Sequence, residues 1–215
     1  ALGTGRGNLG GAGTSLAGLA VGGNSPGDTA VTEEYNNSFE VTTAGAWASG
    51  GALSNRHNSA ATAGTQTASL VSGGNAHPDS PLASVNSEEY NGSSWTEGNN
   101  LNTGRYGLIG FGTQTAAVAA AGDEYPPYSN ATEEYNGTSW SNGEDTNVAS
   151  VVGTGFGILT AGVRASGYVG SPAAFSNGTE EYDGTDWTAV NASNTPRAEG
   201  PGGVGTLTAG VMFAG

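Results

Sequence analysis

One phrase of eight or nine residues occurs four times in the chain, each time with two glutamates ahead of a tyrosine and a turn ahead of an aromatic residue. The copies read TEEYNNSF from residue 32, SEEYNGSSW from 87, TEEYNGTSW from 132 and TEEYDGTDW from 179. A second phrase, of the type GTQTAAVAAAG, alternates with the first and begins at Gly13, Gly64, Gly112, Gly157 and Gly205. Both phrases recur every 45 to 55 residues. A period of this length indicates a repeat architecture.

The 215 residues therefore divide into four full units and half of a fifth, within one domain spanning residues 1–215. The units cover about residues 2–54, 55–102, 103–147, 148–194 and 195–215. The fifth unit lacks the outer hairpin of the others. We expect a continuation of the chain, a neighbouring chain or the N-terminus to supply it.

Each unit reads as four short antiparallel strands. In the third unit, YGLIGFG (106–112) is an extended run, Thr113-Gln114 a turn and residues 115–122 a second run. A loop at 123–130 leads to a third run at 131–135, and Asn136-Gly137 is a strong hairpin signal before the fourth. Apolar residues show no helical spacing, and the 39 glycines disfavour helix.

Four short strands per repeat are typical of a β-propeller blade. The second run carries small residues, which suit the crowded centre of a propeller, whereas the tyrosine and tryptophan of the hairpin suit its wide rim. The sequence thus predicts an all-β propeller of about five four-stranded blades, with the fifth incomplete. An open stack of hairpins is the alternative, because no single residue encodes closure.

Arginine and glutamate recur in register. Arginine precedes the second phrase by seven or eight residues in four units, at Arg6, Arg56, Arg105 and Arg197, whereas the fourth unit has Ser150. The glutamate pairs are Glu33-Glu34, Glu88-Glu89, Glu133-Glu134 and Glu180-Glu181. Neighbouring residues of a strand point to opposite faces, so one glutamate of each pair points between blades. We expect an arginine, from the same blade or the next, to pair with it.

Two other interpretations of the glutamates remain open. They could be solvated charges that protect a sheet edge from aggregation. A ring of carboxylates binding Ca²⁺ is less well supported, because oxygen cages usually take several ligands from one loop and the chain has no Asp-rich loop.

These residues resemble a known repeat family. The segment TPRAEGPGGVGTLTAGVMFAG (195–215) resembles the first half of a kelch repeat, the doublets Gly22-Gly23 and Gly73-Gly74 match the kelch glycine pair, and the hairpin Tyr and Trp match its aromatic pair. The hairpin is shorter than in kelch units, the doublet is reduced to single glycines at 122, 167 and 215, and the histidine that often follows the arginine segment is missing. More specifically, the pattern is similar to the Gly/Thr-rich kelch-like repeats of structural proteins of marine bacteriophages.

That resemblance covers essentially the whole chain. It implies a non-enzymatic virion component, such as a fibre, tail appendage or capsid decoration protein, located on the virion or outside the cell. Its partners would be other virion proteins and a host-surface glycan, and it could form a homo-oligomer. The alternatives are a bacterial or algal surface adhesin and a glycan-active propeller enzyme.

Catalytic chemistry finds little support in the sequence. Kelch-like copper oxidases use Cys, Tyr and His ligands, but this chain has no Cys and only His57 and His77. Adjacent glutamates point apart, unlike the facing carboxylates of glycosidases. The glycine runs lack the lysine and helix of a phosphate loop. We therefore expect no catalytic residue, metal or cofactor.

Composition excludes two classes of partner. The formal net charge of −14, with five cationic side chains, disfavours nucleic acid. No apolar run approaches the length of a membrane span, so membrane insertion is not expected.

Binding is better supported, because the variable connections fall on one face of the predicted propeller. Variable loops on a rigid scaffold commonly carry recognition. The candidate ligand-binding residues in these loops are His77, Asp79, Tyr125, Tyr128, Tyr168 and Phe175. The aromatic rings could stack on sugars or pack against a neighbouring subunit; alternatively, they anchor their own loops.

Overall fold

A computed structural model describes residues 5–14, 17–24, 30–36, 46–75, 83–125, 127–170 and 172–215. In these ranges every regular element is a β-strand, and none is a helix able to cross a membrane. The coarse prediction of an all-β chain built from four-stranded antiparallel sheets is confirmed.

Four sheets contain four strands each, and within each sheet the strands pair in chain order. The first sheet contains β1 (Gly10–Gly13), β2 (Ala17–Val21), β3 (Thr32–Asn36) and β4 (Ala46–Ser49). The second contains β5 (Ala61–Thr65), β6 (Ala68–Ser72), β7 (Ser87–Tyr90) and β8 (Trp95–Glu97). The third contains β9 (Ile109–Thr113), β10 (Ala116–Ala120), β11 (Thr132–Tyr135) and β12 (Trp140–Asn142). The fourth contains β14 (Thr154–Ile158), β15 (Ala161–Ala165), β18 (Thr179–Tyr182) and β19 (Trp187–Val190).

Two smaller sheets complete the described structure. The fifth unit forms a two-stranded sheet of β20 (Gly202–Thr206) and β21 (Ala209–Phe213). A three-stranded sheet contains β13 (Ser150–Val151), β16 (Tyr168–Val169) and β17 (Ala174–Phe175). The sequence did not predict this second sheet, because its strands are only two residues long and the segment resembles a variable loop.

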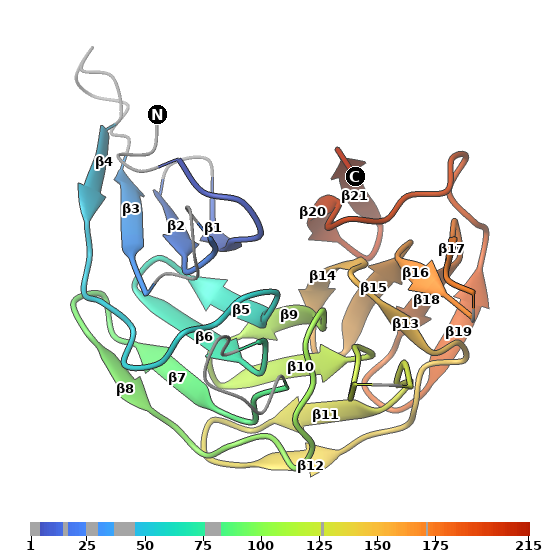
Figure 1. Cartoon of the computed structure of the whole chain (residues 1–215), viewed down its shortest axis with the longest axis horizontal. Coiled ribbons are helices and arrows are strands. Elements are labelled where there is room, and N and C mark those ends of the chain that lie inside the picture. Colours follow the sequence, from blue (N-terminus) through green and yellow to red (C-terminus); the bar gives the residue numbers. More distant parts are fainter. Residues whose placement is uncertain are drawn as a thin grey trace.

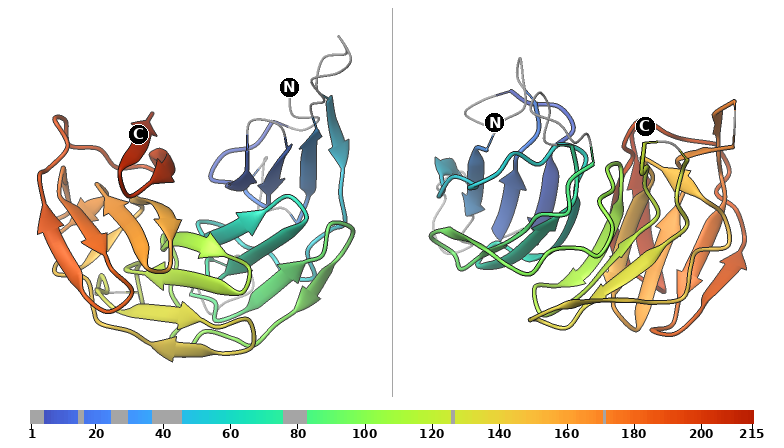
Figure 2. Two further views of the ribbon diagram at one scale, coloured as in Figure 1. Left: turned by 180° about the vertical axis from the view of Figure 1, so that it is seen from behind. Right: turned by 60° about the horizontal axis from the view of Figure 1, so that its bottom comes forward.

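The sheets stand side by side around a common centre in an open, propeller-like arc (Figure 1). Their first strands, β1, β5, β9, β14 and β20, contact one another in this order along the inside of the arc. The last strands β8, β12 and β19, which carry Trp95, Trp140 and Trp187, lie at the outer rim (Figure 1). The first sheet and the β20–β21 pair lie at the two ends of the arc, which Figure 2 shows from two further directions.

Glycine permits the tight turn between the first two strands. Gly112 has a φ of +110°, and a Cβ there would lie 2.3 Å from the carbonyl oxygen of Ala116. The turn itself is Gln114-Thr115, one residue later than the sequence predicted, because Thr113 pairs with Ala116 as the end of the ladder. Glycine also allows the inner strands to approach closely, since a Cβ on Gly110 would lie 2.6 Å from the backbone nitrogen of Thr62 in the neighbouring sheet.

The second hairpin is closed by its Asn or Asp side chain. The Oδ1 atom of Asn136 accepts hydrogen bonds from the backbone N–H groups of Thr138 and Ser139, both at 2.9 Å. Asp183 makes the same contacts to Thr185 and Asp186, at 2.8 and 2.9 Å, and these bonds lower the pKa of its carboxyl group. Asn and Asp are therefore equivalent here, as expected for residues whose side chains cap tight turns.

The hydrophobic core is a series of layers between neighbouring sheets. In three such layers the Tyr-Trp pair of the later sheet packs on apolar residues of the earlier one, as Tyr182 and Trp187 do on Phe111, Val118 and Ala120. The rings of each pair are about 5 Å apart, with centroid distances of 4.9, 5.0 and 4.8 Å in the second, third and fourth sheets.

Polar contacts between sheets repeat with the same register. The indole N–H groups of Trp95, Trp140 and Trp187 donate to the hydroxyl oxygens of Thr32, Ser87 and Thr132 in the preceding sheet, at 2.9, 3.1 and 3.0 Å. The hydroxyl groups of Tyr90, Tyr135 and Tyr182 donate to Glu34, Glu89 and Glu134, the second glutamate of the preceding pair. Thr and the second Glu thus face the next sheet, while the first Glu and Tyr face the previous one.

The first glutamate of each pair is buried and holds the chain that enters its own sheet. Glu133 accepts from the backbone N–H groups of Asn102 and Thr103 and from Arg105 Nη2, at 2.6, 3.3 and 2.8 Å. Arg105 is fully buried and also donates to the carbonyl oxygens of Ala121 and Ala131. Arg6 pairs with Glu33 at 2.9 Å in the same way. The arginine therefore pairs with the first glutamate of its own sheet.

The second sheet corrects the expectation for Arg56, because its neighbour His57 lies beside Glu88 instead. His57 Nε2 lies 3.3 Å from Glu88 Oε1, and His57 Nδ1 donates to the carbonyl oxygen of Gly73 at 2.7 Å. Glu88 also accepts from the backbone of Ser54 and Asn55. In the described part of the chain Arg56 has no ion pair.

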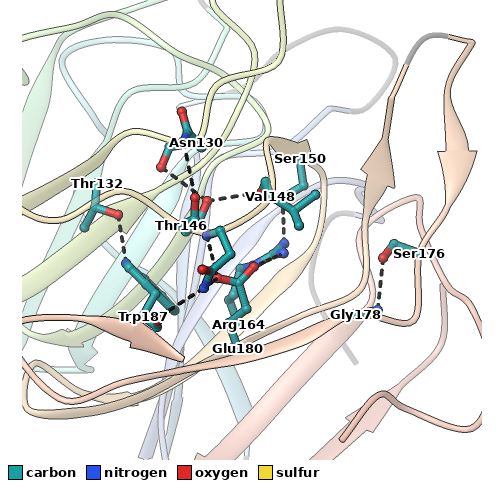
Figure 3. A network of polar contacts seen from close by, with 11 residues as sticks. Asn130, Thr132, Thr146, Val148, Ser150, Arg164, Ser176, Gly178, Glu180 and Trp187 are labelled. Atoms are coloured by element: carbon teal, nitrogen blue, oxygen red, sulfur yellow. Dashed lines mark hydrogen bonds and ion pairs between the residues drawn. The ribbon is translucent and has the colours of Figure 1, made fainter. Parts of the chain in front are cut away.

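In the fourth sheet the guanidinium comes from a strand, and not from the segment ahead of the first strand (Figure 3). Arg164 of β15 donates to Glu180 through Nε at 3.0 Å and to the Ser150 hydroxyl through Nη1 at 2.7 Å. Ser150 occupies the position of the arginine in the other units. Its hydroxyl accepts a hydrogen bond from Arg164, which supplies the guanidinium from β15 instead. The sequence pattern does not indicate this role, because Arg164 lies inside the small-residue phrase, at a position that is Ala119 in the third unit.

Candidate functional site

Two of the six predicted loop residues, His77 and Asp79, lie outside the described residues. The other four belong to the connections between the second and third strands of the third and fourth sheets. Tyr125 and Tyr128 lie in the loop from β10 to β11, whereas Tyr168 and Phe175 lie in β16 and β17.

The loop from β10 to β11 is fixed at both ends by backbone pairing. Asp123 forms bridges with both Tyr106 and Tyr128, so three short segments lie side by side. The Asp123 carboxylate accepts from the Tyr106 hydroxyl at 2.8 Å and from the Tyr125 backbone N–H at 2.6 Å. Sequence reasoning did not single out Tyr106 or Asp123 as site residues. The available signal was an Asp directly after Gly122, which lies two residues beyond the end of β10, followed two residues later by tyrosine.

Tyr125 combines an exposed ring with an unfavourable backbone conformation. Its φ is +68°, in the left-handed region that non-glycine residues seldom adopt, and its side chain is 61% exposed. Such a conformation costs of order 1–3 kcal/mol and persists where the surroundings impose it, often at ligand sites. In this conformation the Tyr125 backbone N–H donates to Asp123 Oδ1.

A cavity of about 650 Å³ lies beside this loop. It is lined by Asp123, Tyr125, Pro127, Tyr128, Ala149, Gly170 and Ala173. The loop provides one wall, and the turn between β16 and β17, which contains Gly170 and Ala173, provides the other. The cavity size is within the range that small ligands occupy.

Tyr168 and Phe175 pair with each other across the β16–β17 hairpin. Their rings meet edge to face at a centroid distance of 5.2 Å, and the two residues are direct partners in the ladder. The Tyr168 hydroxyl donates to Glu199 at 2.9 Å, and this bond raises the pKa of Tyr168 above its ordinary value. These two rings stabilise the hairpin that forms the far wall, and the cavity lining does not include them.

Tyr106 and Asp123 form a hydrogen-bonded pair beside the cavity. Burial, together with the bond to Asp123, raises the pKa of Tyr106 to about 12. Asp123 is the carboxylate among the seven lining residues, and both of its oxygens already accept a hydrogen bond. A carboxylate has about four acceptor sites, so Asp123 can still accept from a ligand hydroxyl.

The described residues include no group of three or more His, Asp or Glu side chains placed to hold a metal ion. The first glutamate of each pair instead lies beside one basic side chain, which is Arg6, His57, Arg105 or Arg164.

A second cavity, of about 720 Å³, runs along the inner strands at the centre of the arc. Its walls are chiefly glycine-rich backbone from β1, β5, β9, β14 and β20. Few side chains with specific chemistry line it, so it is a weaker candidate than the loop cavity.

Comparison with known proteins adds information on the fold. No protein-family model matches the chain, and no curated protein sequence is significantly similar to it. Solved structures do match, among them one described as "Structure of YjhT", with a TM-score of 0.72 and 13% sequence identity. The match covers 93% of this chain and 74% of that one. The likeness is one of fold. It gives no information on what this chain binds.

Proposed function

We propose that the chain is a kelch-like propeller of about five blades that serves as a non-enzymatic structural and adhesion module on a virion. Its role in adhesion is to hold a host-surface sugar in the cavity between the β10–β11 loop and the β16–β17 turn. The virion setting rests on the resemblance of the repeats to those of phage structural proteins, and the sugar on the chemistry of the cavity.

The observation that carries the proposal is the exposed, strained Tyr125 at the mouth of a cavity that also contains Tyr128. An aromatic face offers a flat apolar surface for the C–H groups of a sugar ring, while hydroxyl and carboxylate groups bind its hydroxyls. The bridges at Asp123 hold the loop before ligand arrives, which lowers the ordering cost of binding.

A glycan array followed by titration of the best ligand tests this role. We expect Tyr125→Ala and Tyr128→Ala each to weaken binding by roughly tenfold or more, because each removes one of the ring faces that contact the sugar. The matched control is Ile158→Ala, which truncates a side chain that is 54% exposed at the end of β14 and outside the cavity lining. Unchanged affinity in both tyrosine variants, or no binding to any glycan, would contradict the proposal.

The proposed location of the protein on a virion is tested by a separate measurement. Immunogold electron microscopy with an antibody against this chain is expected to label surface appendages of virus particles. Label confined to cell surfaces would favour a bacterial or algal adhesin instead. Cleavage of a bound polysaccharide, detected as new reducing or unsaturated ends, would favour a glycan-active enzyme.

A further inference from the structure

The contacts between successive sheets leave one set of acceptors open, at the fourth sheet. Thr179 and Glu181 occupy the positions of Thr132 and Glu134, which accept from Trp187 and Tyr182 of the following sheet. In the described part of the chain Thr179 and Glu181 receive no such bonds. Thr179 is also half-buried, whereas Thr32, Ser87 and Thr132 are each 1% exposed.

Among the residues that the structure describes, Arg197 of the fifth unit lacks the carboxylate partner that its counterpart Arg105 has. Arg197 holds the place of Arg105 in the fifth unit and donates to the carbonyl oxygen of Ala214 at 2.7 Å, as Arg105 donates to that of Ala121 at 2.8 Å. Arg105 also pairs with the first glutamate of its sheet. The described residues provide no carboxylate for Arg197. The ion pair expected for this arginine is therefore not formed within the described part of the chain.

The backbone of β21 completes the open site. In the third sheet, β10 pairs with β9 on one side and with β11 on the other. The corresponding strand β21 pairs with β20, and no described strand pairs with its other edge. An edge of this kind accepts an extended segment through backbone hydrogen bonds.

We propose that this open edge binds a β-hairpin of the same sequence type as the chain's own outer hairpins, Glu-Glu-Tyr-Asn-Gly-x-x-Trp, supplied from outside these 215 residues. Its Tyr hydroxyl donates to Glu181, its Trp indole N–H donates to Thr179, and its first glutamate pairs with Arg197. Its first strand extends the sheet along β21. This inference stands independently of the sugar site.

A second copy of the chain is a poorer occupant. The hairpins of this type, at β7–β8, β11–β12 and β18–β19, pair within their own sheets, and β3 likewise pairs with β4. A copy could offer one only by opening one of its sheets. A hairpin that has no inner strands of its own meets no such cost.

The first experiment adds a labelled peptide with the sequence of residues 129–143 to the full chain and measures fluorescence anisotropy. Isolated hairpins are poorly folded, so we expect weak but saturable binding. Glu181→Gln and Arg197→Gln should each weaken it by roughly tenfold or more, because each removes a charged partner. A peptide carrying Tyr135→Phe should lose a similar factor, because it cannot donate to Glu181.

The second experiment makes the interaction intramolecular by appending a copy of residues 123–143 after Gly215, since Gly122 and Gly215 hold the same place in the repeat. The extension should raise Tm by several degrees. Glu181→Gln should then lower the Tm of the extended chain while leaving that of the 215-residue chain unchanged. A scrambled extension of the same composition is the control for chain length.

Three outcomes would overturn the proposal. One is a peptide affinity that does not respond to Glu181→Gln and Arg197→Gln. Another is an extended chain no more stable than the scrambled control. The third is a concentration-dependent dimer, seen by sedimentation, that the peptide does not dissociate; it would assign the edge to a second copy.

Discussion

The first glutamate of each repeated pair shows what a single buried carboxylate does in this protein. It lies beside one basic side chain in all four sheets, and in the second, third and fourth sheets it also accepts one or two backbone N–H groups from the segment that crosses from the preceding sheet. Glu180, for example, accepts from the Asn147 N–H at 2.7 Å and from Arg164. A buried charge is tolerated when it is both paired and hydrogen-bonded, and removing one partner typically costs about 3–5 kcal/mol.

Glu88 predicts how stability depends on acid. Burial raises the pKa of this carboxyl, but the hydrogen bonds from His57 and from the Ser54 and Asn55 backbone outweigh burial and hold it below 4.5. A lowered folded-state pKa means that the stabilisation is complete above about pH 4.5 and is lost as the pH falls through the lower folded value. We expect the free energy of unfolding in urea to fall more steeply for the wild type than for Glu88→Gln between about pH 5 and 3.

The control for this prediction is Glu144→Gln, because Glu144 is exposed in the connection that follows β12 and lies outside the contacts of Glu88. The free energy of unfolding of this control should fall between about pH 5 and 3 as steeply as that of the wild type. An equally steep fall for Glu88→Gln and the wild type would show that Glu88 does not contribute to the acid dependence of stability.

At the scale of the strand, the fourth sheet shows that the cation beside the first glutamate can come from either of two elements. Arg164 lies directly across from Glu180 in the β15–β18 ladder, and Ala119 lies directly across from Glu133 in the β10–β11 ladder. The two positions are structurally equivalent. An arginine at position 119, combined with a serine at position 105, should therefore pair with Glu133 as Arg164 beside Ser150 pairs with Glu180.

We predict that the double variant Arg105→Ser, Ala119→Arg recovers most of the stability that each single change loses. Arg105→Ser alone leaves Glu133 buried without its cation, and Ala119→Arg alone forces a second cation into a filled site. Together they reproduce the arrangement of the fourth sheet. Chemical unfolding of the four proteins gives the coupling free energy, which we expect to favour the pair by at least about 1 kcal/mol. Additive losses would show that the two sheets are not interchangeable.

At the scale of the whole molecule, stability depends on contacts between adjacent sheets. Each core layer joins two neighbours, and each Tyr–Glu and Trp–Thr or Trp–Ser bond crosses the same boundary. Repeat proteins of this kind are stabilised approximately by a sum of unit and nearest-neighbour terms. Loss of one contact should therefore affect the two sheets that share it more than the rest.

The Tyr90 hydroxyl tests this expectation in alkali. Burial and the bond to Glu34 raise the pKa of Tyr90 to about 12, from an ordinary value of 10. A raised pKa means that the contribution is complete below about pH 10 and is lost as the pH rises through about 12. Because Tyr90→Phe removes the titrating group, the variant should be less stable at pH 7 but should lose stability less steeply between about pH 10 and 12.

Hydrogen exchange at pH 7 locates the effect of the same substitution. Protection in Tyr90→Phe should fall chiefly in β3 and β7, the strands that carry Glu34 and Tyr90. A uniform fall across all sheets would contradict nearest-neighbour coupling.

Several features were predictable from the sequence because their causes are local. The alternation of short extended runs with glycine turns predicts the four strands of each unit, and Asn136-Gly137 predicts the β11–β12 hairpin. Alternation along the strand predicts that Glu133 and Glu134 face opposite ways. Partners were predictable only in part: Arg105 in register suggested an ion pair, but the same register suggested Arg56, and His57 takes that place.

The candidate site was predictable only as a position in the chain. Variable loops with aromatic residues indicated Tyr125 and Tyr128, but they equally indicated Tyr168 and Phe175, which pair with each other. The cavity depends on how the loop of one sheet meets the β16–β17 turn of the next. No pattern within either segment encodes that approach.

The sequence by itself thus determined the four-strand pattern of each full unit, its hairpins and the placing of small residues inside and rings outside, because backbone preference and side-chain size act over a few residues. Only the tertiary structure decided which glutamate meets which cation, how Arg164 compensates for Ser150, and where a cavity and an open edge remain. The glutamate and arginine contacts join groups 14 to 31 residues apart in the chain, whose distances are fixed only once the sheets form and pack side by side.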